Sequence, residues 1–183
     1  LLAAPGRVIS ETMTGKKKSN TLLIVLMVVG GVLLFGVVVV GILAALGISG
    51  FRSYLSAAKG AEGQNGAMVL ARGVAECTQQ KQASSGSLTL PASAPPVPSS
   101  LSQVSGRKYQ SSPSDWSADA YTCANFSMTM PQYFQYEWQL DTPTSGRAIA
   151  RGDIDGDGKP DQQFSVTVTC AGSVCTAAAP SRP

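Results

Sequence analysis

The sequence predicts an α+β protein in which a long N-terminal helix packs on an antiparallel sheet of about four strands. Three observations lead to this fold class. An apolar run from residue 22 to residue 50 contains no charged residue and no Pro. Apolar residues then recur at steps of three and four up to about residue 82, as on one face of a helix. From Trp116 onward they alternate with polar residues, as in strands with one buried face.

The apolar run is long enough to cross a bilayer. As a helix it would measure about 43 Å, whereas the hydrocarbon core of a membrane is about 30 Å thick. We therefore expect a transmembrane helix over residues 21–51, with the lipid bilayer as its partner. A buried core helix and a cleaved secretory signal are the competing interpretations, but both usually have a shorter apolar segment.

Charges beside the apolar run indicate its orientation. Lys16, Lys17 and Lys18 precede it, whereas Arg52 alone follows it closely. The positive-inside rule then places the N-terminus in the cytoplasm and the chain from about residue 51 outside. Residues 1–20 are expected to be a cytoplasmic or disordered N-terminus. Within them, residues 1–12 lack periodicity and suggest an upstream extension, with Met13 opening the start of a membrane protein.

Residues 52–82 predict an amphipathic continuation of the helix. Its apolar stripe comprises Phe51, Leu55, Ala58, Met68, Ala71, Val74 and Cys77. Gly60, Gly63 and Gly66 fall at steps of three on one side, and each costs about 1 kcal/mol relative to Ala in a helix. These glycines indicate either a flexible stretch or a face in close contact, and the sequence leaves both open.

The C-terminal part divides at about residue 113. Residues 83–113 are rich in Ser and Pro, which predicts a long surface connection rather than a core element. Residues 114–183 are expected to form the sheet, with strands over 126–130, 134–140, 148–151 and 164–170 and a turn over 141–146. The aromatic residues expected in the core are Trp116, Tyr121, Phe126, Phe134, Tyr136 and Trp138.

An Asp-rich segment predicts a calcium loop. Asp153, Asp155, Asp157 and Asp161 stand at alternate or near-alternate positions, and Gly158 lets the chain turn back. Calcium takes six to eight oxygen ligands, and these carboxylates with the carbonyl of Lys159 would supply most of them. The segment resembles the DxDGDGxxD calcium loops of integrin-type repeats. The alternative is an Asp-Gly turn that holds no metal.

The four cysteines predict disulfides. Cys77, Cys123, Cys170 and Cys175 all lie on the expected outer side of the membrane, where thiols are oxidised. Three pairings are open. We favour Cys170–Cys175, which closes a small loop, and Cys77–Cys123, which ties the helix end to the sheet. A Cys₄ zinc site is the alternative, but the paired CxxC spacing is absent.

Composition argues against several classes of function. The chain has no His, which excludes His-based triads and His metal sites. Its net charge of +3 comes from scattered basic residues, so nucleic-acid binding is not expected. We find no nucleophile–base pair and no evident small-molecule substrate site, and therefore expect no enzyme and no catalytic residues.

Two stretches resemble a known family. GILAALGISGF, residues 41–51, followed by Arg-Ser-Tyr-Leu, resembles the N-terminal helix of type IV pilins and type II secretion pseudopilins. The segments 123–126, 131–136 and 150–157, with Trp116 and Phe164, resemble pilin-like proteins of the delta-proteobacterial fimbrial type. In this alignment Val28 stands at the first mature residue and Val32 where the family has a glutamate. No Gly-Phe cleavage site precedes them, so the chain diverges at the prepilin cleavage site.

The resemblance implies a structural role. The chain would be a membrane-anchored pilin-like subunit of a type IV pilus or related secretion filament, either a major subunit or, as its divergence favours, a minor one. Its calcium-stabilised outer domain would be periplasmic, anchored in the bacterial inner membrane, or displayed on a cell-surface pilus. The family packs its apolar helices together, which here implies contacts through Gly36, Gly41, Ile42, Leu43, Ala44, Ala45 and Phe51. The alternative is a permanently anchored calcium-binding module for adhesion or protein binding, not assembled into filaments.

Overall fold

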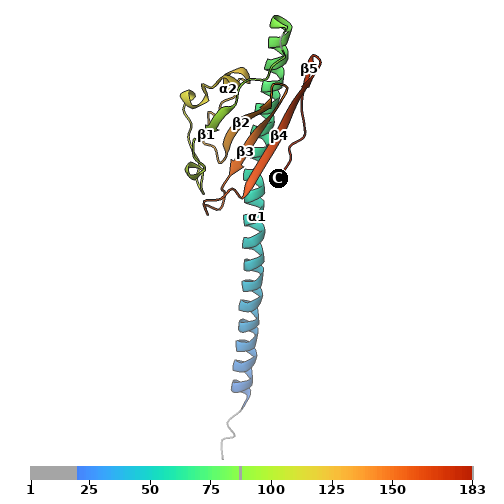
Figure 1. The fold of residues 1–183 in the computed structure, drawn as a ribbon. Coiled ribbons are helices and arrows are strands. Elements are labelled where there is room, and N and C mark those ends of the chain that lie inside the picture. Colours follow the sequence, from blue (N-terminus) through green and yellow to red (C-terminus); the bar gives the residue numbers. More distant parts are fainter. Residues whose placement is uncertain (1–19, 87, 183) are drawn as a thin grey trace, which may run out of the picture. The chain divides into compact units, whose positions relative to one another are not determined.

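The computed structural model describes residues 20–86 and 88–182, and its longest element is helix α1, Thr21–Ser85 (Figure 1). The chain divides into two compact units, Leu1–Ser49 and Gly50–Pro183. The lysine triplet that carries the predicted orientation, and residues 1–19 of the predicted N-terminal segment, lie outside the described residues. The side chain of Arg52 also lies outside them.

The first unit contains the apolar part of α1. Residues Thr21–Gly47 form the one helix in the described part of the chain that is long and apolar enough to cross a membrane. None of this segment is buried, and large side chains such as Leu34, Phe35 and Val37 are about 70% exposed. Length and composition therefore agree with the predicted transmembrane helix, which is weak support for membrane anchoring because signal sequences share these properties.

The second unit is built on a five-stranded antiparallel sheet in the order β1-β2-β3-β4-β5 (Figure 1). Its strands are β1 Ala94–Val97, β2 Gln135–Thr142, β3 Ser145–Gly152, β4 Gln162–Ala171 and β5 Val174–Ala177. Strands β2 to β5 follow one another as consecutive hairpins, so each neighbour in sequence is also a neighbour in the sheet. The predicted α+β class is confirmed, and the predicted strands 134–140, 148–151 and 164–170 correspond to β2, β3 and β4.

The predicted strand at residues 126–130 is wrong. These residues follow helix α2, Asp119–Cys123, and the amide of Phe126 donates to the carbonyl of Tyr121 at 2.9 Å. Asn125 adopts a positive φ of 49° and its amide donates to the carbonyl of Thr122, which completes a Schellman helix end. Apolar and polar residues do alternate here, but the backbone of residues 126–130 does not pair with a strand. It forms hydrogen bonds with the end of α2 and with the side chains of Gln110 and Ser111.

The segment 83–113, predicted as a surface connection, contains a strand and a short helix that its Ser- and Pro-rich composition did not indicate. It includes β1 and the short 3₁₀ helix η1, Leu101–Gln103, and it buries Leu90, Ala94, Val97 and Val104. Strand β1 reads Ala-Pro-Pro-Val and pairs only with β2. Pro is tolerated on an edge strand because its missing N–H faces away from the ladder. A Pro-rich composition therefore did not exclude this strand.

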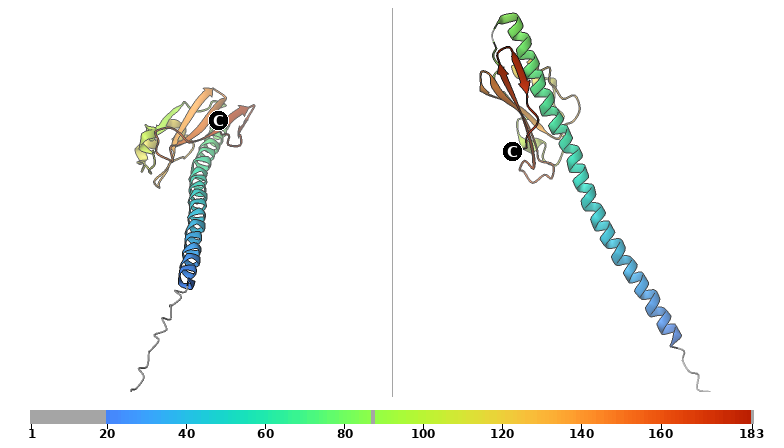
Figure 2. Two further views of the ribbon diagram at one scale, coloured as in Figure 1. Left: turned by 90° about the horizontal axis from the view of Figure 1, so that it is seen from below. Right: turned by 90° about the vertical axis from the view of Figure 1, so that its right-hand side faces the viewer.

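Helix α1 packs on one face of the sheet through glycines (Figure 2). Gly60, Gly63 and Gly66 are buried, and a Cβ added to Gly63 would lie 2.5 Å from the ring of Phe134. A Cβ added to Gly66 would lie 2.5 Å from the hydroxyl of Tyr136. The glycines are therefore contact positions and not a melted stretch. The first part of the predicted apolar stripe is wrong in consequence, because Phe51, Leu55 and Ala58 are exposed while the glycine side faces the sheet.

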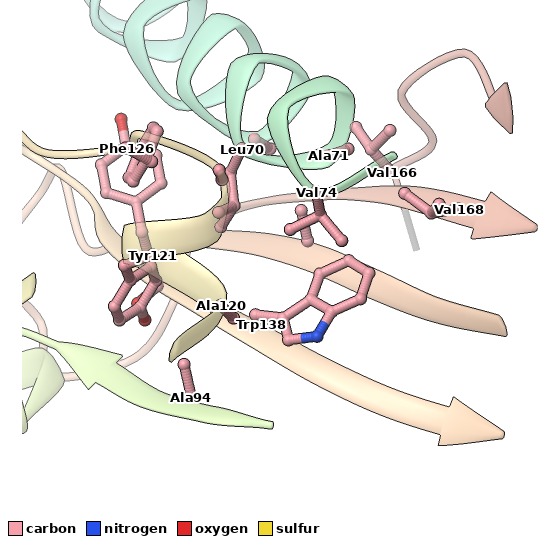
Figure 3. Packing of buried hydrophobic residues seen from close by; sticks show 14 of the residues in the cluster. Leu70, Ala71, Val74, Ala94, Ala120, Tyr121, Phe126, Trp138, Val166 and Val168 are labelled. Carbon is pink, nitrogen blue, oxygen red and sulfur yellow. The ribbon is translucent and has the colours of Figure 1, made fainter. Parts of the chain in front are cut away.

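The core continues toward the C-terminal end of α1. Leu70, Ala71 and Val74 face Trp138 of β2 and Val166 and Val168 of β4 (Figure 3). All six aromatic residues predicted for the core are at most 5% exposed. Between η1 and α2 the chain forms a further 3₁₀ helix, η2, Pro113–Trp116. Trp116 packs edge-on against Tyr121 at a centroid distance of 5.1 Å.

Candidate metal site

The Asp-rich segment is the connection between β3 and β4. Gly152 and Gln162 are paired across the two strands, so residues 153–161 form a closed loop at this end of the hairpin. The amide of Asp161 donates to the carbonyl of Gly152 at 3.0 Å, which closes the neck of the loop. The sheet therefore fixes both ends of the segment that carries the candidate ligands.

Asp153 organises the loop from inside. Its side chain is buried, and its carboxylate accepts the amides of Gly156 at 2.8 Å, Asp157 at 3.1 Å and Gly158 at 2.9 Å. Gly156 and Gly158 have φ angles of 81° and 87°, a conformation that L side chains rarely adopt. The two glycines thus let successive amides turn toward one carboxylate.

A second segment supports the same residue. The amide of Gly106 donates to the carbonyl of Asp153 at 2.8 Å. A hydrogen bond from the hydroxyl of Ser105, with those from the amides of Gly158 and Gly156, lowers the pKa of Asp153 against the opposing effect of desolvation. Asp153 is consequently held as a carboxylate. Sequence reasoning missed Ser105 and Gly106, because nothing in a Ser-Gly pair some fifty residues upstream indicates this contact.

Three of the predicted ligands come together. Asp153, Asp155 and Asp157 each present a carboxylate oxygen, and these oxygens lie within 4.8 Å of one another. Asp155 and Asp157 are exposed at the loop surface. Hard carboxylate oxygens suit calcium or magnesium better than softer metals. Asp155 and Asp157 therefore offer exposed oxygens that suit a hard divalent cation, whereas both oxygens of Asp153 already accept backbone amides.

The remaining predicted ligands have other contacts. The carboxylate of Asp161 accepts the amides of Ile154 at 3.1 Å and Asp155 at 3.2 Å, so it caps the start of the loop outside the three-carboxylate group. Lys159, predicted through its carbonyl, is exposed, and its amide donates to the carboxylate of Asp157 at 2.8 Å. The loop is thus folded by its own backbone amides around three converging carboxylates.

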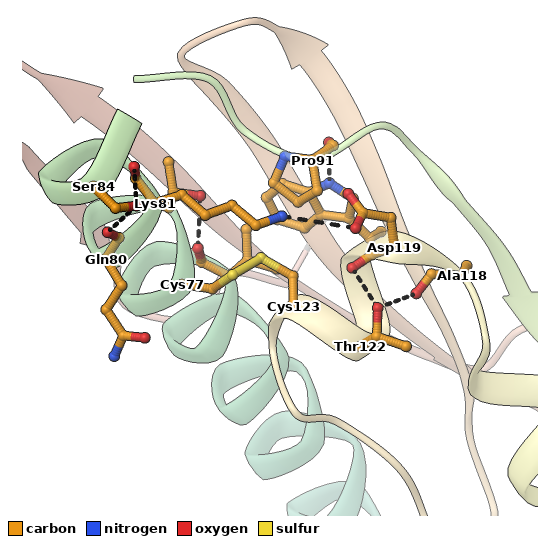
Figure 4. Close-up of a disulfide and its surroundings, with 12 residues drawn as sticks. Cys77, Gln80, Lys81, Ser84, Pro91, Ala118, Asp119, Thr122 and Cys123 are labelled. Atoms are coloured by element: carbon orange, nitrogen blue, oxygen red, sulfur yellow. Dashed lines mark hydrogen bonds and ion pairs between the residues drawn. A yellow bond between two sulfur atoms is a disulfide. The ribbon is translucent and has the colours of Figure 1, made fainter. Parts of the chain in front are cut away.

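The cysteines pair as favoured from the sequence. Cys77 of α1 is bonded to Cys123 of α2, with the two Cα atoms 5.6 Å apart (Figure 4). Cys170 and Cys175 face each other directly across β4 and β5 and form the second disulfide. No cysteine is free, so the four sulfurs do not form the alternative zinc site.

The predicted assembly residues lie along α1. Gly36, Gly41 and the segment Ile42–Ala45 belong to the exposed apolar part of the first unit. Apart from the neighbouring backbone of α1 itself, no described atom lies within 4 Å of a Cβ added at either glycine. Phe51 is 61% exposed in the second unit. These residues are uncovered within one chain.

Comparison of the chain with protein-family models, with curated proteins and with solved structures gives no match.

Proposed function

We propose that the chain is a membrane-anchored, pilin-like structural subunit. The observation that carries this proposal is the composition of α1, one continuous helix from Thr21 to Ser85. Its first part is apolar on every side and uncovered, whereas residues 60–78 bury one side against a sheet. A helix that is apolar all round needs lipid or other helices to cover it.

Assembly would use the small residues of the apolar part. Gly36 and Gly41 line an apolar groove on α1 together with Val32, Leu33, Val37 and Val40. Without a hydrophobic driving force inside lipid, close approach of helices depends on such small residues. We propose that this groove receives the apolar helix of another subunit. The N-terminus would be cytoplasmic and the second unit periplasmic or, in a filament, at the bacterial surface.

The Asp-rich loop would bind calcium and stabilise the outer unit. Asp153, Asp155 and Asp157 concentrate negative charge in a loop whose ends are held by β3 and β4. A bound cation would relieve their repulsion. This part of the proposal is structural, and it assigns no catalytic role to the chain.

A permanently anchored binding module is the second candidate. It is favoured by Val32, which occupies the position of the family's glutamate in the alignment given above, and by the loop's exposed Asp155 and Asp157. Such a module would keep its apolar segment in the membrane and use the outer unit for adhesion or protein binding.

The two candidates are separated by the N-terminus and mass of the protein, measured in membranes and in sheared surface filaments. A chain that begins near Val28–Val32 and is recovered in filaments supports the pilin-like subunit. An unprocessed chain found only in membranes supports the anchored module and contradicts our proposal.

Two substitutions sharpen the test. Gly36→Leu fills the apolar groove and should reduce recovery in filaments while membrane insertion is retained. Gly31→Leu adds the same side chain on the opposite side of the helix from the groove and serves as the matched control. Equal filament recovery from both variants would show that the groove is not an assembly contact.

A further inference from the structure

A cavity of about 430 Å³ opens in the second unit between α1 and the Asp-rich loop. Pockets that hold small ligands usually measure about 300–1,000 Å³, so the cavity has the size of a binding site. Its lining comes from two walls, Leu55, Ser56 and Lys59 of α1 and Ile154, Asp155 and Asp161 of the loop. Each of these residues is exposed or half-buried, so a ligand can reach all of them.

The α1 wall carries a cation that an aromatic ring holds in place. The ammonium of Lys59 lies 4.6 Å from the ring centroid of Tyr133. A ring orients a cation without neutralising it, and among the described residues Lys59 forms no ion pair. Beside it, the Ser56 hydroxyl accepts a hydrogen bond from Nε2 of Gln162 at 2.7 Å, and its own O–H can donate to a further group. This wall therefore offers a positive charge and a hydroxyl donor, as a phosphate requires.

The loop wall carries negative charge. Asp155 and Asp161 are both exposed, and Asp161 lies outside the group of three converging carboxylates. The Asp161 carboxylate accepts the amides of Ile154 and Asp155, but each carboxylate oxygen has a second site for a donor. This wall suits an ammonium group and repels an anion, whereas Lys59 on the facing wall repels a cation. The two walls together match a ligand that carries both a phosphate and an ammonium.

Apolar side chains continue from the cavity along α1. Leu55 is 41% exposed, and Phe51 and Tyr54, one turn earlier on the same side of the helix, are 61% and 70% exposed. Grouped exposed apolar side chains mark contacts with proteins or membranes, and Tyr is enriched where a membrane meets water. Gly50 begins the second unit three residues after the apolar span ends at Gly47, a distance of at most about 10 Å. These side chains are therefore close to any membrane that the span crosses.

We propose that this cavity binds the head group of a phospholipid whose phosphate is linked to a primary ammonium, the chemistry of phosphatidylethanolamine. The phosphate accepts hydrogen bonds from Lys59 and Ser56, the ammonium donates to Asp161, and the apolar part of the lipid lies on Leu55 and Phe51. The proposal rests on the membrane anchoring proposed above. It does not depend on filaments, because every lining group belongs to the second unit of one chain.

The test is a titration of the full chain in dodecylmaltoside with dihexanoyl phospholipids, followed by NMR of the isotope-labelled methyl groups of Ile154. The probes are phosphatidylethanolamine, phosphatidylcholine, whose ammonium is fully methylated, and phosphatidylglycerol, which has no ammonium. We expect saturable shifts with phosphatidylethanolamine and at least tenfold weaker binding of the other two, because only the first supplies both a phosphate and N–H donors. Glycerophosphoethanolamine, the head group without acyl chains, should also bind more weakly, since it cannot cover Leu55 and Phe51.

Two variants test the assigned charges. Lys59→Met keeps the stem of the side chain and removes the ammonium, so binding of phosphatidylethanolamine should fall about tenfold. Asp161→Asn should weaken phosphatidylethanolamine by a similar factor and strengthen phosphatidylglycerol, because the wall then repels an anion less. A purely structural role of Asp161 would weaken both lipids together. Arg72→Met removes a positive charge from an exposed position of α1 outside the cavity and should leave binding unchanged. Melting curves check that each variant is folded.

Three results would overturn the proposal. The first is that phosphatidylethanolamine leaves the Ile154 signal of the wild type unchanged, or binds no more tightly than the other two lipids. The second is that the folded Lys59→Met variant binds it as tightly as the wild type. The third is that glycerophosphoethanolamine binds as tightly as the lipid, which would make the ligand a soluble compound.

Membrane anchoring is measured separately, by alkaline extraction of membranes that contain the chain. Release of the chain into the supernatant contradicts the anchored subunit, whereas the lipid titration in detergent reports on the cavity alone. Failure of the proposed function and failure of the lipid site are therefore distinguished.

Discussion

Replacing Gly73 by Ala adds one methyl group where α1 packs directly against the end of α2. An ideal Cβ at this position would lie 2.9 Å from the Cα of Ala124 and closer still to its carbonyl oxygen. These are backbone atoms, so no side-chain rotation can make room. Ala124 also follows Cys123, whose disulfide to Cys77 holds α2 against α1. The methyl group must therefore strain the backbone.

The magnitude follows from two opposing effects. Ala is favoured over Gly within a helix by about 1 kcal/mol. Overpacking a tightly packed position costs about 1–3 kcal/mol, and a backbone obstacle points to the upper end. We expect Gly73→Ala to lower the free energy of unfolding by about 2 kcal/mol. A Cβ at Gly66 meets the far end of the Tyr136 side chain instead of backbone atoms, so Gly66→Ala should lower the free energy of unfolding less.

Gly50→Ala is the matched control. Apart from the neighbouring backbone of α1 itself, no described atom lies within 4 Å of a Cβ added at Gly50, so only helix propensity acts there and stability should stay the same or rise. The assay is urea unfolding of the full chain in detergent micelles, followed by near-ultraviolet circular dichroism of the tryptophans. Close packing through glycines is refuted if Gly73→Ala is as stable as Gly50→Ala, or if Gly66→Ala is the most destabilised of the three.

Three further predictions concern the covalent, ionic and titrating groups. Changing both Cys77 and Cys123 to Ala should lower the free energy of unfolding by about 4 kcal/mol. The same change at the Cys170–Cys175 disulfide should lower it by about 2 kcal/mol, because that disulfide closes a much shorter loop. Equal losses in denaturant unfolding would contradict this. Calcium should raise the melting temperature of the wild-type protein, and a chelator should reverse this rise. Asp155→Ala should abolish the effect of calcium. If neither calcium nor chelator changes the melting temperature of the wild type, calcium binding is contradicted. Burial raises the pKa of Glu62, although the amide of Tyr133 donates a hydrogen bond to its carboxylate. The folded protein therefore binds this proton more tightly than the unfolded chain does. As pH rises above the ordinary pKa of a glutamate, ionisation of Glu62 lowers the stability of the folded protein. Glu62→Gln should therefore gain stability relative to the wild type between pH 4 and pH 7, and a constant difference across that range would show that Glu62 does not titrate abnormally.

Sequence predicted the parts of the fold whose signal is local. The alternation over 134–140 and 164–170 marks β2 and β4 because one face of each strand meets the core. The same alternation over 126–130 misled, since a pattern of side chains does not reveal whether a neighbouring strand exists to pair with. The glycines of α1 stayed undecided for a related reason, because their partners Phe134 and Tyr136 are some seventy residues away.

The candidate site was predictable only in its carboxylates. The spacing of Asp153, Asp155 and Asp157 indicated their convergence, because alternate side chains around glycines can face one point. The spacing did not indicate that the Asp161 carboxylate would accept backbone amides of the loop. It also did not indicate that Asp153 would be the buried carboxylate around which the loop folds. Those roles depend on which carboxylate is buried where β3 and β4 meet the loop, which the spacing of the residues does not reveal.

The Cys77–Cys123 disulfide has a mechanical consequence. If tension is applied between the apolar part of α1 and the C-terminus, the force runs along the helix to Cys77 and crosses the sulfur–sulfur bond to Cys123. The intervening chain, with its sequence separation of 46, bears no load while the bond is intact. Its extended length of about 160 Å becomes available only after reduction. Strand β1 and most of α2 would therefore carry no tension when a force extends the rest of the chain.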